Sequence, residues 1–131
     1  MSTDATTWAK KIFAVTIFTE DLAASKAFYQ NVFGLSLVFE GDTSAVFKIG
    51  ETLINVLDIN SADELVNPAK VASPDSGSRY VFTIHVDDVD AMCADLISRG
   101  VTLINGPMDR PWGIRSASFS DPGGHIWEIA K

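Results

Sequence analysis

Residues 13–35 read FAVTIFTEDLAASKAFYQNVFGL, and this stretch decides the fold class. From Lys11 to Thr19 the chain is rich in Phe, Val, Ile and Thr, which is typical of a strand. Asp21 then precedes apolar residues at helical spacing, and Gly34 follows the last of them. A side-chain oxygen at a helix start accepts a hydrogen bond from a free backbone N–H, and glycine commonly ends a helix. The stretch therefore predicts a strand followed by a helix.

The same pattern returns in the second half of the chain. Residues 83–101 read TIHVDDVDAMCADLISRGV, so that a strand predicted over 79–86 leads into a helix that ends at Gly100. The two predicted caps, Asp21 and Asp88, are 67 residues apart, and the two terminal glycines are 66 apart. Such a constant offset indicates a duplicated module. Three short strands follow each helix, predicted over 36–40, 45–49 and 52–57 and over 101–105, 114–120 and 125–130.

The organisation predicted is one domain over 1–131, which suits a chain of this length. Its two modules cover residues 10–58 and 79–131. The linker between them, 59–78, is rich in Asn, Ser, Asp and Pro and has weak periodicity, with a helical turn expected near 62–66. Residues 1–9 are expected to form a loose arm.

Composition excludes several classes of protein. Apolar residues make up 47% and charged residues 21% of the chain, which is ordinary for a globular domain. The net charge of -7 argues against nucleic acid or an anionic membrane as partner, because both bind basic surfaces. The single cysteine, Cys93, cannot form an internal disulfide, and no apolar run is long enough to span a bilayer. We expect a cytoplasmic protein.

Three segments carry a resemblance to a known family. Residues 13–35 resemble the opening of the glyoxalase/bleomycin-resistance/extradiol-dioxygenase superfamily, also called vicinal oxygen chelate proteins. Residues 83–101 resemble the start of its second module, and FSDPGGHIWEI, residues 119–129, resembles the closing hairpin. The resemblance implies an α+β fold of two βαβββ modules. Their sheets would curl into a U-shaped or partial barrel around a cavity, with the helices outside, and the chain would form a homodimer.

The resemblance also assigns four metal-ligand positions, one on each of four inward-facing strands. In this chain they are occupied by Ala14, Asn55, Val81 and Glu128. Only Glu128 is a typical ligand, and a catalytic divalent metal needs about three protein ligands and an open position. We therefore expect no metal and no cofactor. The sequence is similar to the metal-free branch, which includes proteins that bind bleomycin and other antibiotics.

Successive side chains of a strand point to opposite faces, so further residues can be assigned to the same inward face. If Ala14 faces the cavity, Thr16 does too, while Phe13, Val15 and Ile17 face the helix layer. The inward face would mix apolar side chains with a few polar ones, as a ligand pocket requires. The alternative is a face that is merely solvated. The candidate ligand-binding residues on these strands are Thr16, Asn55, Thr83, His85 and Glu128.

The segment MDRPWGIR, residues 108–115, is a second candidate. Pro107 and Pro111 restrict its backbone, and Trp112 between Arg110 and Arg115 could close over a planar ligand by stacking. The alternative is a loop packed on its own protein or on a dimer partner. We expect Cys93 to be an inert helix residue and His125 to be a turn residue. Three phenylalanines are assigned to the core: Phe39, Phe47 and Phe119.

Two functions follow. The first is an acidic homodimer that binds a small organic molecule, cationic or aromatic, without metal. Glu128 would accept from a ligand N–H in this function, or would only pair with a neighbouring Arg or Thr. The second is a lyase, isomerase or dioxygenase with relocated metal ligands, His85, Glu128 and Glu51, or with metal-free acid–base chemistry. A third, an accessory domain acting through protein contacts, is also open.

Overall fold

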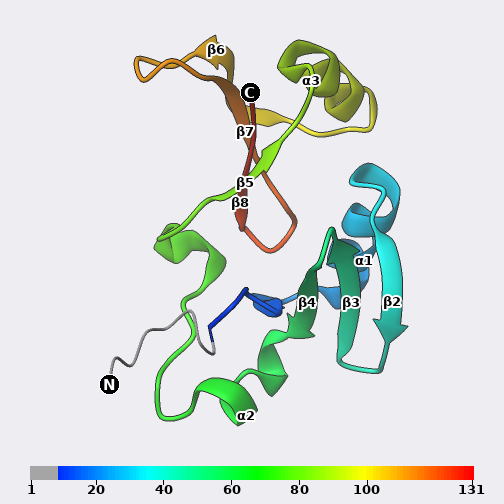
Figure 1. Ribbon diagram of the computed structural model, residues 1–131. Helices are drawn as coiled ribbons and strands as arrows, with labels where there is room; N and C mark the ends of the chain where they lie inside the picture. The colour runs from blue at the N-terminus through cyan, green and yellow to red at the C-terminus, as the bar shows by residue number, and fades with distance from the viewer. Residues whose placement is uncertain (1–8) are drawn as a thin grey trace.

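The structure is a computed structural model that describes residues 9–131, so the arm expected over 1–9 lies almost wholly outside the described residues. The first module forms one four-stranded sheet in the order β1-β4-β3-β2 (Figure 1). β1 is parallel to β4, and the other neighbours are antiparallel. The strands and helices of this module are β1 (Ala14–Thr19), α1 (Leu22–Ala27), the π-helical turn η2 (Phe28–Val32), β2 (Ser36–Glu40), β3 (Ser44–Ile49) and β4 (Thr52–Asp58).

The second module repeats this arrangement in a sheet of order β5-β8-β7-β6. β5 is parallel to β8, as β1 is to β4. The two sheets stay separate and do not close into a barrel, and the α+β fold of two βαβββ modules is confirmed. The elements of the second module are β5 (Phe82–His85), α3 (Val89–Ser98), β6 (Leu103–Asp109), β7 (Arg115–Ser120) and β8 (Ile126–Ala130).

The connection between the modules is built from short helical turns (Figure 1). The expected helical turn is present as α2 (Asp63–Val66), flanked by the 3-10 turns η3 (Ile59–Ser61) and η4 (Pro74–Ser76). None of the helices over residues 9–131 is long and apolar enough to cross a membrane.

Both predicted helix caps are present. Oδ1 of Asp21 accepts from the backbone N–H of Ala24 at 3.0 Å, and Oδ1 of Asp88 accepts from that of Ala91 at 3.0 Å. Each bond satisfies a donor that the first turn of a helix leaves free. The first helix differs from expectation in its last turns, because η2 widens to π geometry before Gly34.

The core joins the two modules through aromatic side chains. Tyr29 of η2 is fully buried and contacts Phe47 of β3 and Trp127 of β8 at ring-centroid distances of 5.6 and 6.1 Å. Phe28 contacts Phe119 of β7 at 6.4 Å. The apolar face of each sheet therefore packs toward η2, which fixes how the modules sit relative to each other.

Three local expectations were wrong. Phe13 precedes β1 and is 68% exposed, so it does not pack on the helix layer. Phe39 is 57% exposed, because the register of β2 against β3 shifts between Leu37 and Phe39, and a bulge of this kind redirects the side chains that follow it. Residues 106–109, expected in a loop, continue β6. Phe47, Phe119 and Cys93 are buried as predicted.

Candidate functional site

A groove lies between the first strands of the two modules. β1 pairs only with β4, and β5 pairs only with β8, so each presents one unpaired edge. Two hollows of about 270 and 290 Å³ line these edges and share Val15 and Phe82. We call them together the inter-module groove. Its remaining lining residues are Thr16, Ile17, Phe18, Ile49, Thr52, Ile54, Tyr80, Val81, Thr83, Ile84, His125 and Trp127.

Each wall of the groove carries a threonine bonded to a polar residue on the neighbouring strand. Thr16 lies beside Asn55 in the parallel β1–β4 register, and Asn55 Nδ2 donates to Thr16 Oγ1 at 3.3 Å. Thr83 lies beside Glu128 in the parallel β5–β8 register, and Thr83 Oγ1 donates to Glu128 Oε1 at 2.8 Å. The duplication thus bonds the threonine of one wall to an amide and the threonine of the other wall to a carboxylate.

These pairs leave acceptor atoms available. Asn55 Oδ1 is buried and has no hydrogen-bond partner among the described residues. Burying an unpaired carbonyl oxygen costs about 1–3 kcal/mol. Glu128 is half-buried, and one of its oxygens is engaged by Thr83. Glu128 therefore pairs with a neighbouring threonine, as one reading of the sequence expected, and this pairing does not use both of its oxygens.

Besides Asn55 and Glu128, three further predicted site residues are not among those that line the two hollows. His85 is exposed at the end of β5. Trp112 is 68% exposed in the turn between β6 and β7. Arg115 donates to both carboxylate oxygens of Asp90 at 2.8 Å and to Asp109 at 3.1 Å. The structure places Thr16 and Thr83 in the lining of the groove, with Asn55 and Glu128 bonded to them from the adjacent strands, and does not bring these three residues to it.

The carboxylates around Arg115 hold its guanidinium in place. The hydrogen bonds that Arg115 donates to Asp90, and then to Asp109, raise its pKa above the ordinary value. The hydrogen bond from Arg115 in turn lowers the pKa of Asp90. These hydrogen bonds between Asp90 and Arg115 tie α3 to β7 and join residues 25 positions apart in the chain, so the sequence did not predict them.

Arg110 lies on sheet two rather than in a free loop. Its Nε donates to Ser116 Oγ at 2.7 Å, and an Nη donates to Asn105 Oδ1 at 2.6 Å. The register places Asn105 beside Ser118, and Ser118 beside Glu128. A polar row therefore crosses all four strands of the second sheet and ends at the groove.

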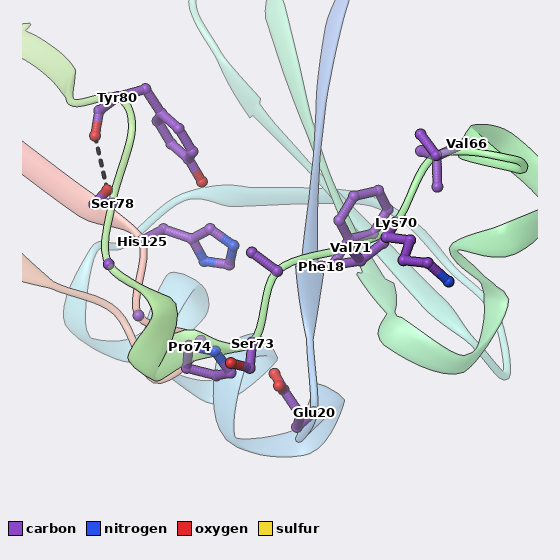
Figure 2. A pocket seen from close by; sticks show the side chains of 15 residues that line it. Phe18, Glu20, Val66, Lys70, Val71, Ser73, Pro74, Ser78, Tyr80 and His125 are labelled. Carbon is purple, nitrogen blue, oxygen red and sulfur yellow. Dashed lines mark hydrogen bonds between the residues drawn. The ribbon is translucent and has the colours of Figure 1, made fainter.

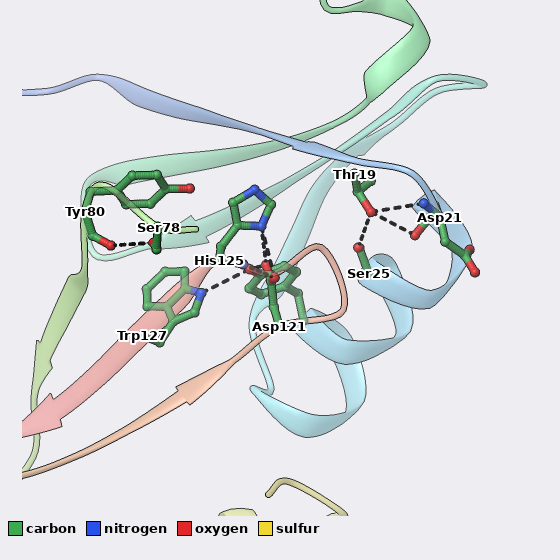
Figure 3. A network of polar contacts seen from close by, with 9 residues as sticks. Thr19, Asp21, Ser25, Ser78, Tyr80, Asp121, His125 and Trp127 are labelled. Carbon is green, nitrogen blue, oxygen red and sulfur yellow. Dashed lines mark hydrogen bonds and ion pairs between the residues drawn. The ribbon is translucent and has the colours of Figure 1, made fainter. Parts of the chain in front are cut away.

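A buried polar network was not predicted. Asp121, whose side chain is 1% exposed, accepts from the hydroxyl of Tyr29 and from the backbone N–H of His125 at 2.8 Å (Figure 3). Nδ1 of His125 lies 2.8 and 3.0 Å from the two carboxylate oxygens. Trp127 Nε1 donates to the Tyr29 oxygen at 3.1 Å. Burial first, and then the charge of Asp121, raises the pKa of Tyr29 far above its ordinary value.

The donor atoms do not fit a catalytic metal. Ala14 and Val81 offer none, and Asn55 and Glu128 are a neutral amide and a single carboxylate. Over residues 9–131 no three His, Cys, Asp or Glu side chains gather as a metal site would require. The proposed trio of His85, Glu128 and Glu51 is not assembled, since Glu51 lies in the β3–β4 turn, 3.7 Å from Lys11 Nζ.

The profile of the Glyoxalase/Bleomycin resistance protein/Dioxygenase superfamily matches residues 11–129. The chain therefore belongs to this superfamily, as the three sequence segments indicated.

Individual relatives agree with this assignment. The chain is 32% identical over 125 residues to the uncharacterized protein YraH of Bacillus subtilis, covering 92% of this chain and 98% of that one. It is 32% identical over 113 residues to the metallothiol transferase FosB of Lysinibacillus sphaericus, covering 83% and 73%. The crystal structure of TnmS3, an antibiotic-binding protein from Streptomyces, superposes with a TM-score of 0.68 at 27% identity, covering 91% and 93%.

Proposed function

We propose that this protein binds a small organic molecule in the inter-module groove without the help of a metal. The observation that carries the proposal is the composition of the groove. Its walls are mostly apolar, and its polar groups include Thr16 and Thr83, which are hydrogen-bonded to Asn55 and Glu128 on the neighbouring strands. Such a mixture of apolar surface and a few fixed polar groups is typical of a ligand site.

The polar groups favour a ligand that donates hydrogen bonds. The buried Asn55 Oδ1 lacks a donor within the described chain, and Glu128 offers a carboxylate oxygen. Separate amine, amide or hydroxyl groups of a ligand that reach past Thr16 and Thr83 would satisfy them. The net charge of -7 favours a cationic ligand in addition. The name of TnmS3 supports an antibiotic as a member of this ligand class.

The likeness to FosB raises the alternative of metal-dependent chemistry, since that relative is named a metallothiol transferase. At the positions where the family resemblance assigns metal ligands, this chain keeps Glu128 alone. One carboxylate and one amide do not compete with water for a divalent transition metal at ordinary concentrations. The groove therefore supports binding better than metal catalysis.

The experiment combines metal analysis with thermal unfolding. Purified protein is expected to contain no stoichiometric transition metal by mass spectrometry, and Zn²⁺ or Mn²⁺ should not raise its melting temperature. A panel of basic antibiotics and aromatic amines should contain compounds that do, because a ligand of the native state stabilises it. Glu128→Gln should weaken the binding of such a ligand about tenfold, because it removes one hydrogen bond to a charged group.

The matched control is Glu51→Gln, which removes the same charge from an exposed turn. If both variants weakened ligand binding equally, the effect would be one of overall charge, and this would contradict a site at Glu128. A stoichiometric metal that Glu128→Gln removes would overturn the proposal as a whole.

The homodimer expected from the family resemblance is part of the proposal. Several large apolar side chains on or beside the outer strands β2 and β6 are exposed, which favours their burial against a second copy. Sedimentation equilibrium is expected to give twice the chain mass, and a monomer at micromolar concentration would contradict it. The exposed residues are Val38, Phe39, Ile104, Met108 and Trp112.

A further inference from the structure

A third hollow lies under the linker, beside the inter-module groove. It has a volume of about 300 Å³ and is enclosed by residues of the linker, the end of β1 and the turn before β8. We call it the linker hollow. Figure 2 shows the imidazole of His125 and the ring of Tyr80 on one side of it, facing Phe18 and Val71. The ring centroids of Tyr80 and His125 are 6.4 Å apart.

Asp121 fixes the orientation of His125. Nδ1 of the imidazole lies within 3.0 Å of both carboxylate oxygens, and the backbone N–H of the same residue donates to Oδ1. A carboxylate only accepts hydrogen bonds, so Nδ1 carries the proton. In the neutral imidazole the lone pair is then on Nε2, which points away from Asp121 (Figure 3). Nε2 has no hydrogen-bond partner among residues 9–131.

The side chain of His125 is 11% exposed, with one nitrogen oriented by Asp121 and the other free to bond to a group from outside the described chain. The hollow that His125 lines has room for a ligand group. The arrangement is that of an oriented hydrogen-bond acceptor at the end of a mostly apolar hollow.

The surrounding charges disfavour an anion next to His125. Asp121 is directly behind the ring, Glu20 also lines the hollow, and Lys70 is the cation among the lining residues. The negative charge of Asp121 also acts on Tyr80, whose pKa is raised first by burial and then by this charge. A neutral group that donates a hydrogen bond fits these charges better than a carboxylate. The rings of Phe18 and Tyr80 favour an aromatic body.

We propose that the linker hollow binds a neutral aromatic hydroxyl compound, whose O–H donates to Nε2 of His125. This inference goes beyond the proposed function, because the linker hollow, although it shares Phe18, Tyr80 and His125 with the groove, does not use Asn55 or Glu128. Asp121 is a positioning residue here: it selects the tautomer that presents an acceptor. Tyr29 and Trp127 hold that carboxylate from behind.

The test uses 2-naphthol and its methyl ether, 2-methoxynaphthalene, which has the same aromatic body but no donor. Titration with 2-naphthol is followed by the imidazole ¹⁵N resonances of wild-type protein. The chain has two histidines, so His85→Gln assigns the two ring systems. We expect 2-naphthol to shift the ¹⁵N resonance of His125 Nε2. We also expect it to bind about tenfold more tightly than the ether, because one hydrogen bond contributes about that much to the affinity.

His125→Phe retains a ring of similar size and should bind both compounds with equal affinity. Equal affinity of the wild type for both compounds, or a shift confined to His85, would overturn the proposal. The ¹⁵N titration of wild-type protein decides the question even if His125→Phe does not fold. The two proposals can fail separately, because His125→Phe removes the acceptor proposed here, whereas Glu128→Gln leaves that acceptor in place and removes the carboxylate proposed for the groove.

Discussion

Removing the hydroxyl of Tyr29 is expected to destabilise the protein strongly. Tyr29 is fully buried, and its hydroxyl donates to Asp121 and accepts from Trp127 Nε1. In Tyr29→Phe the buried carboxylate loses one donor, and the indole N–H loses its acceptor. A hydrogen bond to a charged group contributes about 1.5–3 kcal/mol, and an unpaired buried donor costs about 1–3 kcal/mol. We expect the free energy of unfolding to fall by about 3 kcal/mol.

Urea unfolding measures this loss, with Tyr80→Phe as the control. Tyr80 is 43% exposed, and its hydroxyl has no partner among the described residues, so its removal should change stability by less than about 0.5 kcal/mol. A loss below about 1 kcal/mol in Tyr29→Phe would refute the reasoning, because the hydroxyl would then not bridge two buried groups.

The same residue predicts an alkaline limit of stability. The pKa of Tyr29 is raised above its ordinary value of 10.0, chiefly by burial, so the native state keeps a proton that the unfolded chain releases. Stability contributed in this way is complete below about pH 10 and falls above it, by up to about 1.4 kcal/mol per pH unit. Unfolding between about pH 9 and pH 11 should show this slope, and Tyr29→Phe should reduce it. An equal slope in both proteins would contradict the assignment.

Three further substitutions test other contacts. Gly106→Ala should lower the free energy of unfolding by more than about 3 kcal/mol, because its Cβ would lie 2.6 Å from the Ser116 carbonyl oxygen. Its control, Gly113→Ala, has a similar φ and open space around the added Cβ, and should lower it by about 1 kcal/mol. Urea unfolding measures both. Gly123→Ala would place a Cβ 2.7 Å from the His125 ring, and should weaken the binding of 2-naphthol measured by the ¹⁵N titration. Gly34→Ala, at an open helix end, should leave that binding unchanged. In Arg115→Gln, the carboxyl carbon resonance of Asp90 should titrate at higher pH than in wild type, since Arg115 lowers the Asp90 pKa; an unchanged titration would refute this contact.

The local features of the fold were predictable from the sequence. Asp21 and Asp88 cap the helices through contacts three residues away, so the sequence next to them contains the whole interaction. The strands lie close to their predicted positions because alternation is also a local pattern. Phe39 was misplaced for the complementary reason. Its direction depends on a register shift against β3, which the residues of β2 alone do not indicate.

The candidate site was predictable in part. The pairs Thr16–Asn55 and Thr83–Glu128 lie on strands that the family resemblance brings together, and all four residues were selected. The groove itself depends on how the modules dock, and the aromatic contacts of Tyr29 set that docking. The bond between Tyr29 and Asp121 joins residues 92 positions apart in the chain, and no spacing rule indicates it.

The length of one turn explains why the duplicated modules differ in chemistry. In the first module two residues, Gly50 and Glu51, connect β3 to β4, and Glu51 remains at the surface near Lys11. In the second module five residues, 121–125, connect β7 to β8. The longer turn lets Asp121 reach the buried hydroxyl of Tyr29 and presents His125 to the linker hollow. An acid–base pair is thus added to one end of a pseudosymmetric groove, while the sheets and helices of the two modules keep the same order.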